Sequence, residues 1–397
     1  GVLLADNLPT FTLEIVPERV KNLAGVIEHI RQFIPVSQPD VERFLSTATL
    51  NRFESIPLRF KLTEEERAIF SVNRYLFPGV EIQARIARHY LKPELTSHVL
   101  GYVGRIDAED MLTLEGNPEY KGSLYNGKKG VEKYYEQILQ GKVGYEQIQT
   151  DARGRKLEVL KRTAPLPGQD IYLTIDLELQ TAAAEALKGK RGSVVALNPN
   201  NGEILVLASV PGFDTNPFVN GIDAKTYEEL QDPWWKPMYN RALQGRYPPG
   251  STIKPFMALA GLELGIADPT KKKYCKGWYN LPGVAHNYRD WKKTGHGYMD
   301  THSAIVQSCD VYFYDLAVRM GIKRLGDYLS QFGFGKSTEV DLTDEKSGIL
   351  PSPQWKKNRF KQAWYLGETV SIGIGQGYWL ITPLQMASAI GTLASRG

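Results

Sequence analysis

The chain has few cysteines, no long hydrophobic run and little excess charge. Only two of its 397 residues are cysteines, too few for a framework of disulfides. No stretch approaches the ~18 consecutive apolar residues that a membrane-spanning helix needs. The net charge of +4 is too small to indicate nucleic acid as a partner. What remains is a hydrophobic content of 42%, enough for buried cores, and a length that predicts two or three domains.

The most informative segment is the sequence YPPGSTIKP at residues 247–255. Its prolines and glycine end one element and predict a helix that begins near Ser251. Residues three apart share a helix face, so Lys254 is expected beside the Ser251 hydroxyl. A serine becomes a good nucleophile when a base takes its proton, and burial and the helix dipole favour the neutral lysine that can do this. The segment outlines a serine acyl-transfer site, although a bare S-x-x-K is more often a capping serine with a surface lysine.

The flanking residues give this motif its weight. With them, the segment resembles the active-site segment of class B penicillin-binding proteins, the periplasmic D,D-transpeptidases that cross-link peptidoglycan. Other stretches resemble the same family over nearly the whole chain, namely SHVLGYVG at 97–104, YRDWKKTGHG at 288–297, VQSCDVYFYDLAVRMGI at 306–322, GIGQGYW at 373–379 and TPLQM at 382–386. Together they look like the elongation-type group, penicillin-binding protein 2 of Gram-negative bacteria.

The sequence pattern changes near residue 165. Residues 1–165 predict a strand at 10–16 and helices at 20–34 and 63–73. The resemblance implies that this part is a non-catalytic pedestal of the dimerisation type.

Residues 166–397 have the more compact α/β pattern. They predict a strand at 171–175, a helix at 176–189 capped by Asp176, and a hairpin at 193–208 through an Asn-Gly turn. This order resembles the start of a penicillin-binding transpeptidase domain. The expected fold is therefore α+β and multidomain, an extended pedestal followed by a serine β-lactamase-like domain with an antiparallel sheet and helices.

The family's second motif is S-x-N, whose serine relays protons between the lysine and the leaving amine. Ser308 matches this serine, but Asp310 stands in place of the asparagine. The aspartate could cap the helix that follows, or pair with Lys254 and hold it in the charged form, which opposes a role as base. The resemblance assigns catalytic roles to Ser251, Lys254, Ser308 and Asp310, and leaves open whether Lys254 or Ser308 dominates proton transfer.

The family's third motif is K-[TS]-G on the edge strand of the sheet. Lys293-Thr294-Gly295 precedes Ser308, which is the wrong order, and Lys346-Ser347-Gly348 is followed by Pro351, which would interrupt a strand. We therefore expect the motif to lie beyond Gly397, so that the transpeptidase domain is incomplete in this sequence.

A sparse cluster of possible metal ligands lies between residues 275 and 309. Cys275, Asp290, His296 and Cys309 are a mixture that zinc accepts, although their spacing is not a zinc-finger signature. From the residues alone, a Cys275–Cys309 disulfide or two unrelated buried thiols are alternatives. The resemblance implies a structural zinc beside the active serine with these four ligands, Cys275 standing where the family more usually has aspartate. Two further histidines are alternative ligands, His286 and His302.

The resemblance also implies the reaction. Ser251 attacks the D-Ala–D-Ala carbonyl of a stem peptide, D-Ala leaves, and an amine of a neighbouring stem resolves the acyl-enzyme; β-lactams trap this intermediate. The oxyanion is expected on the Ser251 backbone N–H and a donor of the edge strand. A serine β-lactamase or β-lactam sensor and a non-catalytic scaffold are the alternatives.

Partners and location follow from the same resemblance. It implies the glycosyltransferase RodA and elongation-complex proteins such as MreC as partners. It also implies a single membrane anchor upstream of Gly1, in the bacterial inner membrane, with the catalytic part in the periplasm.

Overall fold

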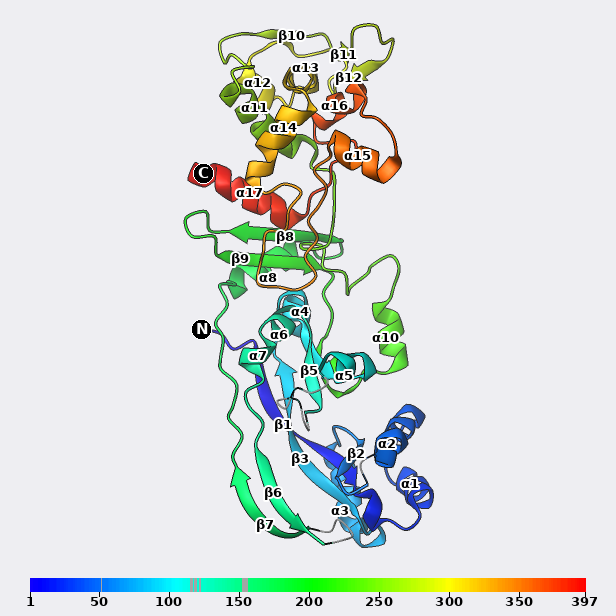
Figure 1. The fold of residues 1–397 in the computed structure, drawn as a ribbon. Coiled ribbons are helices and arrows are strands. Elements are labelled where there is room, and N and C mark those ends of the chain that lie inside the picture. The colour runs from blue at the N-terminus through cyan, green and yellow to red at the C-terminus, as the bar shows by residue number, and fades with distance from the viewer. Residues whose placement is uncertain (51, 115–116, 118–119, 121–122, 152–155) are drawn as a thin grey trace. The chain divides into compact units, whose positions relative to one another are not determined.

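The computed structural model describes the chain except for residues 51, 115–116, 118–119, 121–122 and 152–155. The chain divides into unit 1, formed by Gly1–Tyr172 and Phe213–Gln231, and unit 2, formed by Leu173–Gly212 and Asp232–Gly397. Both units combine helices with antiparallel strands, which confirms the predicted α+β class (Figure 1). Among the described residues, no helix combines the length and the apolar character needed to cross a bilayer.

Unit 1 is built on a three-stranded antiparallel sheet. Its central strand is β1 (Ala5–Ile15), which pairs with β2 (Ile56–Arg59) on one side and along its whole length with β3 (Val80–Tyr90) on the other (Figure 1). The end of β1 lies in the core, where Leu13 and Ile15 are fully buried. The predicted strand at 10–16 is therefore confirmed.

The two helices predicted in unit 1 are also present. They are α1 (Leu23–Arg31) and α3 (Glu64–Asn73). The sequence before α3 forms a capping box, because Thr63 accepts from the Glu66 backbone N–H and the Glu66 carboxylate accepts from the Thr63 backbone N–H. This local signal explains why the start of α3 could be predicted from sequence.

The segment Phe213–Gln231 joins unit 1 although it lies far along the chain. The Asn216 side chain accepts from the Tyr90 backbone N–H and donates to the Tyr90 carbonyl, and the Phe218 ring stacks on Tyr102. No local sequence pattern predicts this return. The remaining elements of unit 1 are η1 (Pro17–Arg19), α2 (Gln38–Leu50), η2 (Arg74–Leu76), α4 (Pro93–Leu100), β4 (Tyr102–Arg105), α5 (Ala108–Leu114), β5 (Tyr125–Lys129), α6 (Gly130–Tyr134), α7 (Glu136–Leu139), β6 (Tyr145–Thr150), β7 (Lys156–Thr163), α9 (Asn216–Asn220) and α10 (Ala224–Leu230).

Unit 2 begins with a helix and a hairpin, as predicted. In α8 (Leu177–Ala186), Asp176 is the N-cap, and the antiparallel hairpin consists of β8 (Gly192–Leu197) and β9 (Ile204–Val210). The predicted strand at 171–175 is wrong. That stretch runs beside β9, where the Asp176 N–H bonds to the Leu205 carbonyl, but it lacks the repeated pairing of a ladder.

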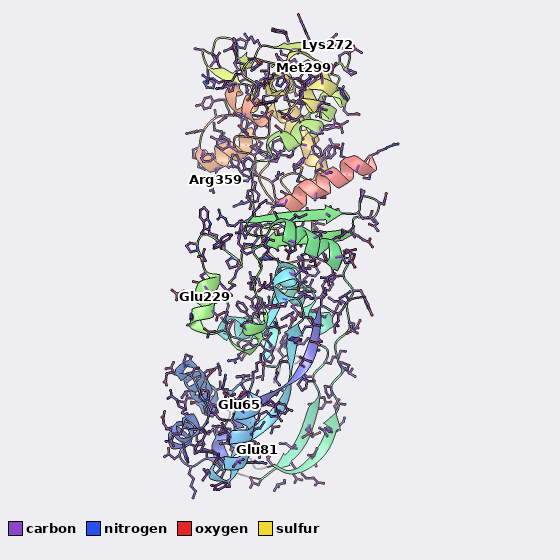
Figure 2. All side chains as sticks on the ribbon, turned by 180° about the vertical axis from the view of Figure 1, so that it is seen from behind. Glu65, Glu81, Glu229, Lys272, Met299 and Arg359 are labelled. Carbon is purple, nitrogen blue, oxygen red and sulfur yellow. The ribbon has the colours of Figure 1, made fainter. Side chains whose placement is uncertain are left out.

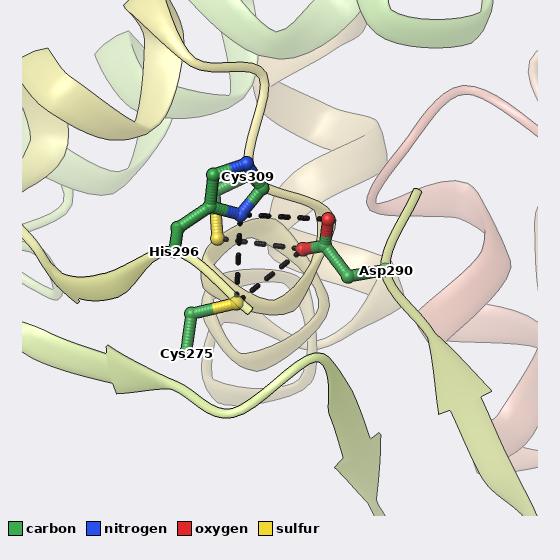
Figure 3. Close-up of side chains that lie close together, drawn as sticks. All are labelled: Cys275, Asp290, His296 and Cys309. Carbon is green, nitrogen blue, oxygen red and sulfur yellow. Dashed lines mark hydrogen bonds and ion pairs between the residues drawn. The ribbon is translucent and has the colours of Figure 1, made fainter. Parts of the chain in front are cut away.

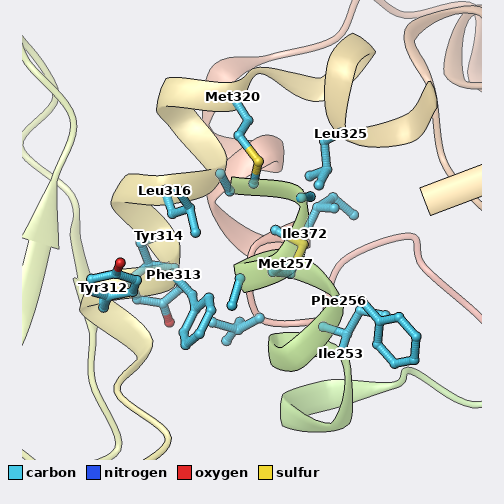
Figure 4. Close-up of a cluster of buried hydrophobic side chains, with 14 of the residues drawn as sticks. Ile253, Phe256, Met257, Tyr312, Phe313, Tyr314, Leu316, Met320, Leu325 and Ile372 are labelled. Carbon is cyan, nitrogen blue, oxygen red and sulfur yellow. The ribbon is translucent and has the colours of Figure 1, made fainter. Parts of the chain in front are cut away.

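A helical core follows the hairpin in unit 2. Phe256 and Met257 come from one helix and Phe313 and Leu316 from another, and all four are almost completely buried together with Ile372 (Figure 4). The helices of this part are η4 (Gly250–Ile253), α11 (Lys254–Glu263), α12 (Thr301–Val306), α13 (Asp310–Met320), α14 (Ile322–Leu329), η5 (Ser330–Phe332), α15 (Pro353–Phe360), α16 (Leu366–Ile372) and α17 (Pro383–Ser395).

Two small antiparallel pairs of strands lie between α11 and α12 in the sequence. They are β10 (Lys273–Cys275) with β13 (Gly297–Met299), and β11 (Trp278–Asn280) with β12 (Asn287–Arg289). In the first pair, Lys273 lies opposite Met299. Figure 2 labels Met299 and also Lys272, the residue before Lys273. Of the predicted metal ligands, Cys275 lies in β10, Asp290 directly follows β12 and His296 directly precedes β13.

Candidate active site and metal cluster

Ser251 lies in the turn that opens the central helix of unit 2. The turn is η4, a 3₁₀ turn that continues directly into α11, so the predicted helix start is confirmed. Gly250 has a positive φ of 57°, and its N–H bonds to the Gly375 carbonyl at 2.9 Å, which fixes the turn against the GIGQG segment. Pro255 is tolerated because it falls in the first turn of α11. The result is an exposed Ser251 followed by a buried Lys254.

The Lys254 ammonium group is completely hydrogen-bonded inside the protein. Its Nζ lies 2.8 Å from the Ser308 carbonyl oxygen, 3.0 Å from Ser308 Oγ and 2.6 Å from Asp310 Oδ1. Ser308 Oγ is in turn 3.0 Å from Ser251 Oγ. Ser308 therefore lies between Lys254 and Ser251, and the lysine expected beside the nucleophile reaches it through this second serine.

Asp310 supplies the negative charge for Lys254. It is the first residue of α13, whose N-cap is Cys309, so Asp310 itself is not the cap. The side chains of the pair are nearly buried, 2% exposed for Lys254 and 11% for Asp310. A buried lysine of this kind needs a partner, because an unpaired buried charge is strongly destabilising. Of the two roles expected for Asp310, the structure shows the ion pair.

Neither candidate for the third motif occupies a strand. Residues 293–295 lie in the turn before β13, and residues 346–348 lie in an irregular segment before the isolated bridge between Ile349 and Leu380. Both sequences therefore lack the strand context that the motif requires.

The four predicted metal ligands converge on one point in the structure (Figure 3). One ligand atom from each of Cys275, Asp290, His296 and Cys309 lies within 4.8 Å of the others. The Sγ atoms of both cysteines are 3.5 Å from Asp290 Oδ2, Cys275 Sγ is 3.6 Å from His296 Nδ1, and that nitrogen is 3.5 Å from Asp290 Oδ1. A tetrahedron with zinc–ligand bonds of 2.0–2.3 Å has edges of about 3.3–3.8 Å. The four contacts of 3.5–3.6 Å lie within this range, and the widest separation in the group, up to 4.8 Å, lies outside it.

The chemistry of these side chains also fits a cation. Burial raises the pKa of the Cys309 thiol far above its usual range, and the neighbouring Cys275 and Asp290 raise it further. A thiolate at this position therefore needs a positive charge close by. Both cysteines are free and buried, so the thiols are not joined as a disulfide. His296 Nε2 is buried without a hydrogen-bond partner among the described residues.

Backbone groups fix the carboxylate of this cluster. Asp290 Oδ1 accepts from the Lys292 N–H at 3.0 Å, and Asp290 Oδ2 accepts from the Val311 N–H at 3.1 Å. Such outer contacts orient metal ligands in proteins. The alternative ligands His286 and His302 are exposed and lie outside the cluster.

Comparison with known proteins decides the family. Residues 192–397 match the penicillin-binding protein transpeptidase domain, and residues 1–173 match the penicillin-binding protein dimerisation domain. The chain belongs to the penicillin-binding proteins. The predicted resemblance to the elongation-type group is confirmed by the relatives that follow.

Curated relatives of this penicillin-binding protein match it along its whole length. It is 46% identical to the peptidoglycan D,D-transpeptidase MrdA of Acinetobacter baumannii and 41% identical to that of Escherichia coli. The chain spans 59% and 63% of the lengths of these two relatives.

Solved structures show the same relationship. A complex of penicillin-binding protein 2 with MreC from Helicobacter pylori has a TM-score of 0.85 at 32% identity, covering 100% of this chain and 74% of that one. The penicillin-binding protein 2 of Pseudomonas aeruginosa in complex with WCK 5153 has a TM-score of 0.72 at 45% identity, covering 79% of this chain and 65% of that one.

One residue of this penicillin-binding protein was missed by the sequence reasoning. Trp291 directly follows Asp290, and it hydrogen-bonds to both Ser308 and Asp310. A single exposed tryptophan in a loop has no spacing pattern that would reveal this. The available signals were its place in the family-like stretch at 288–297 and its position between a predicted metal ligand and a pair of lysines.

Proposed function

We propose that this chain is the periplasmic part of a peptidoglycan D,D-transpeptidase. The observation that carries the proposal is the hydrogen-bonded series from Ser251 through Ser308 to the buried Lys254, which Asp310 holds in place. An exposed serine linked to a buried base through one hydroxyl is what acyl transfer requires. The names of the MrdA relatives support this reaction.

The geometry suggests how acylation proceeds. Ser251 Oγ attacks the carbonyl carbon of the penultimate D-Ala, while its proton passes to Ser308 Oγ and the Ser308 proton passes to Lys254 Nζ. This route requires that Lys254, which is ion-paired with Asp310 in the structure, has first released one proton, because an ammonium group cannot accept one. The negative charge on the carbonyl oxygen is stabilised by the Ser251 backbone N–H, which belongs to the 3₁₀ turn that opens α11. Protonation of the leaving nitrogen by the same route releases D-Ala, and the ester on Ser251 is then attacked by the amine of a second stem peptide.

We also propose that a structural zinc binds Cys275, Asp290, His296 and Cys309. Four protein ligands leave no open position, so the ion would stabilise the fold and take no part in the reaction. Its contribution to the site would come through Cys309, which follows Ser308 directly, and through Asp290, which accepts from the Val311 N–H.

The proposed partners and location follow from the relatives. One solved relative is a penicillin-binding protein 2 bound to MreC, another is a peptidoglycan synthase complex that coordinates polymerization and crosslinking, and a third carries the ligand WCK 5153. We accordingly propose stem peptides as substrates, β-lactams as inhibitors, MreC and the glycosyltransferase RodA as partners, and attachment to the inner membrane with this part in the periplasm.

The proposal is tested by intact-protein mass spectrometry of the full-length protein after exposure to a penicillin, with peptide mapping. We expect one stable adduct on Ser251 and none on Ser251→Ala, whose fold should be unchanged because Ser251 is exposed. Absence of an adduct on the folded natural protein would contradict the proposal. Rapid loss of the adduct with release of hydrolysed penicillin would instead identify a β-lactam-hydrolysing relative.

A further inference from the structure

Trp291 contacts two groups of residues in unit 2. They are the acylation cluster, formed by Ser251, Lys254, Ser308 and Asp310, and the metal cluster, formed by Cys275, Asp290, His296 and Cys309. Trp291 directly follows Asp290, and its ring meets the His296 ring at a centroid distance of 5.4 Å with an edge-to-face geometry. At 65% exposure, Trp291 is far more open to solvent than Asp290 or His296.

Both N–H groups of Trp291 donate hydrogen bonds to residues of the acylation cluster. Its backbone N–H donates to Asp310 Oδ2 at 3.1 Å, on the carboxylate whose other oxygen pairs with Lys254. Its indole Nε1–H donates to the Ser308 carbonyl at 3.1 Å and lies 3.3 Å from the Gln307 carbonyl. The same Ser308 carbonyl accepts from Lys254 Nζ at 2.8 Å. The indole and the lysine therefore hold one peptide group from two sides.

That peptide belongs to a residue in a strained backbone conformation. Ser308 has a φ of 52°, in the left-handed region that residues other than glycine adopt only when their surroundings enforce it. The carbonyl carbon of Ser308 is bonded to the Cα that carries the side chain, so hydrogen bonds to this carbonyl restrain the position of Cα. Ser308 Oγ is 3.0 Å from both Ser251 Oγ and Lys254 Nζ, and a displacement of Cα would change these distances.

The neighbours of Trp291 fasten the same two segments together. Asp290 accepts from the Val311 N–H, and the Tyr314 hydroxyl donates to the Arg289 carbonyl at 3.1 Å. Residues 289–291 therefore form hydrogen bonds with the first turns of α13. Among these residues, Trp291 also binds Ser308.

We propose that Trp291 is a positioning residue for acylation, whose indole N–H holds the Ser308 peptide so that the Ser308 hydroxyl bridges the nucleophile and the lysine. This inference rests on the proposed function, since it concerns the rate of the same acylation step. The proposed role belongs to the indole N–H alone. The backbone N–H of Trp291 is not part of it, because almost any residue at this position would provide that group.

The test compares Trp291→Phe with Trp278→Phe in the full-length protein. Phenylalanine keeps an aromatic ring and the backbone bond to Asp310 but removes the indole donor. Trp278 is a matched control, because it is an exposed tryptophan of β11 that packs against Lys276. The measurements are the first-order acylation rate constant and the dissociation constant for a fluorescent penicillin, together with zinc content and Tm.

For Trp291→Phe we expect the acylation rate constant to fall about two- to tenfold, as for the loss of one neutral hydrogen bond. The dissociation constant, zinc content and Tm should stay at the wild-type values, and Trp278→Phe should match wild type throughout. Equal rate constants for all three proteins would overturn the role of Trp291 and leave the proposed function intact. A slower Trp291→Phe that also loses zinc and Tm would overturn it too, because the ring would then serve the fold. A wild-type protein that does not acylate would overturn the proposed function itself.

Discussion

The acylation cluster and the metal cluster are neighbours built from the same turn, yet they differ in how far the protein alone completes them. Ser308, Cys309 and Asp310 are consecutive, and the outer two serve the first cluster while Cys309 serves the second. Around Lys254 every ammonium proton has an acceptor at 2.6–3.0 Å and the charge is balanced. In the metal cluster, Asp290 lies 3.5 Å from both thiols and from the imidazole, Cys275 Sγ lies 3.6 Å from His296 Nδ1, and the buried Cys309 resists ionisation. Protein atoms therefore satisfy the ammonium group in the first cluster, whereas the longer contacts of the second cluster are consistent with the proposal that an ion completes it.

The largest effect is expected from removal of the base. Lys254→Ala should lower the acylation rate constant by about 10²–10⁴-fold, the range of general-base catalysis. The measurement is the time course of adduct formation on Ser251 by mass spectrometry. Unchanged acylation would show that Lys254 is not the base.

A matched variant separates chemistry from folding in this experiment. Truncation of Lys254 leaves the Asp310 carboxylate buried without its partner, which costs about 3–5 kcal/mol of stability. In Lys254→Met/Asp310→Asn both charges are removed and the lysine volume is largely kept. This double variant should fold more stably than Lys254→Ala, as measured by Tm, and should acylate just as slowly.

The fold could be predicted from sequence where the signals are local. The capping box at Thr63, the Asp176 cap and the Asn-Gly hairpin each depend on residues close together in the chain, and each is present in the structure. The stretch 171–175 has a strand-like sequence, but it is not a strand in the structure, because it does not form a ladder with β9. The return of Phe213–Gln231 to unit 1 depends on tertiary contacts of Asn216 and Phe218, which no local pattern reveals.

In the candidate site, too, local patterns could be predicted from the sequence, whereas contacts between distant residues could not. The S-x-x-K spacing pointed to Ser251 and Lys254, but the position of Ser308 between them depends on a contact across more than fifty residues. The metal cluster gathers residues from separate loops and strands, so the residue types alone left a disulfide and unrelated thiols open. Trp291 was missed because its role comes from where its indole N–H lies in space.

Removal of the metal is expected to have the next largest effect. Elemental analysis should find one zinc per chain, and a strong chelator should lower Tm by roughly 8–16 °C, since saturating ligand contributes about 4 kcal/mol at a thousand times its dissociation constant. Cys275→Ser should lose the zinc and show the same drop without chelator. This variant is preferred to a Cys309 variant because Cys275 lies on β10, away from Ser308.

The two exposed histidines provide the control for this measurement. His286→Ala and His302→Ala should keep the zinc and the wild-type Tm, because both lie outside the cluster. Full zinc content in Cys275→Ser, or an unchanged Tm after complete removal of the metal, would contradict a structural zinc at these ligands.

The smallest effect is expected at Asp310, whose carboxylate accepts from both Lys254 and the Trp291 N–H. Asp310→Asn keeps a side-chain oxygen that can accept from Lys254 or from the Trp291 N–H, but its amide group cannot serve both. One hydrogen bond is lost, while removal of the carboxylate charge favours the neutral lysine that acts as base. These effects oppose each other, so acylation should stay within about tenfold of wild type. Acylation as slow as in Lys254→Ala would mean that the site needs the Asp310 charge itself, and the family's asparagine could not replace it here.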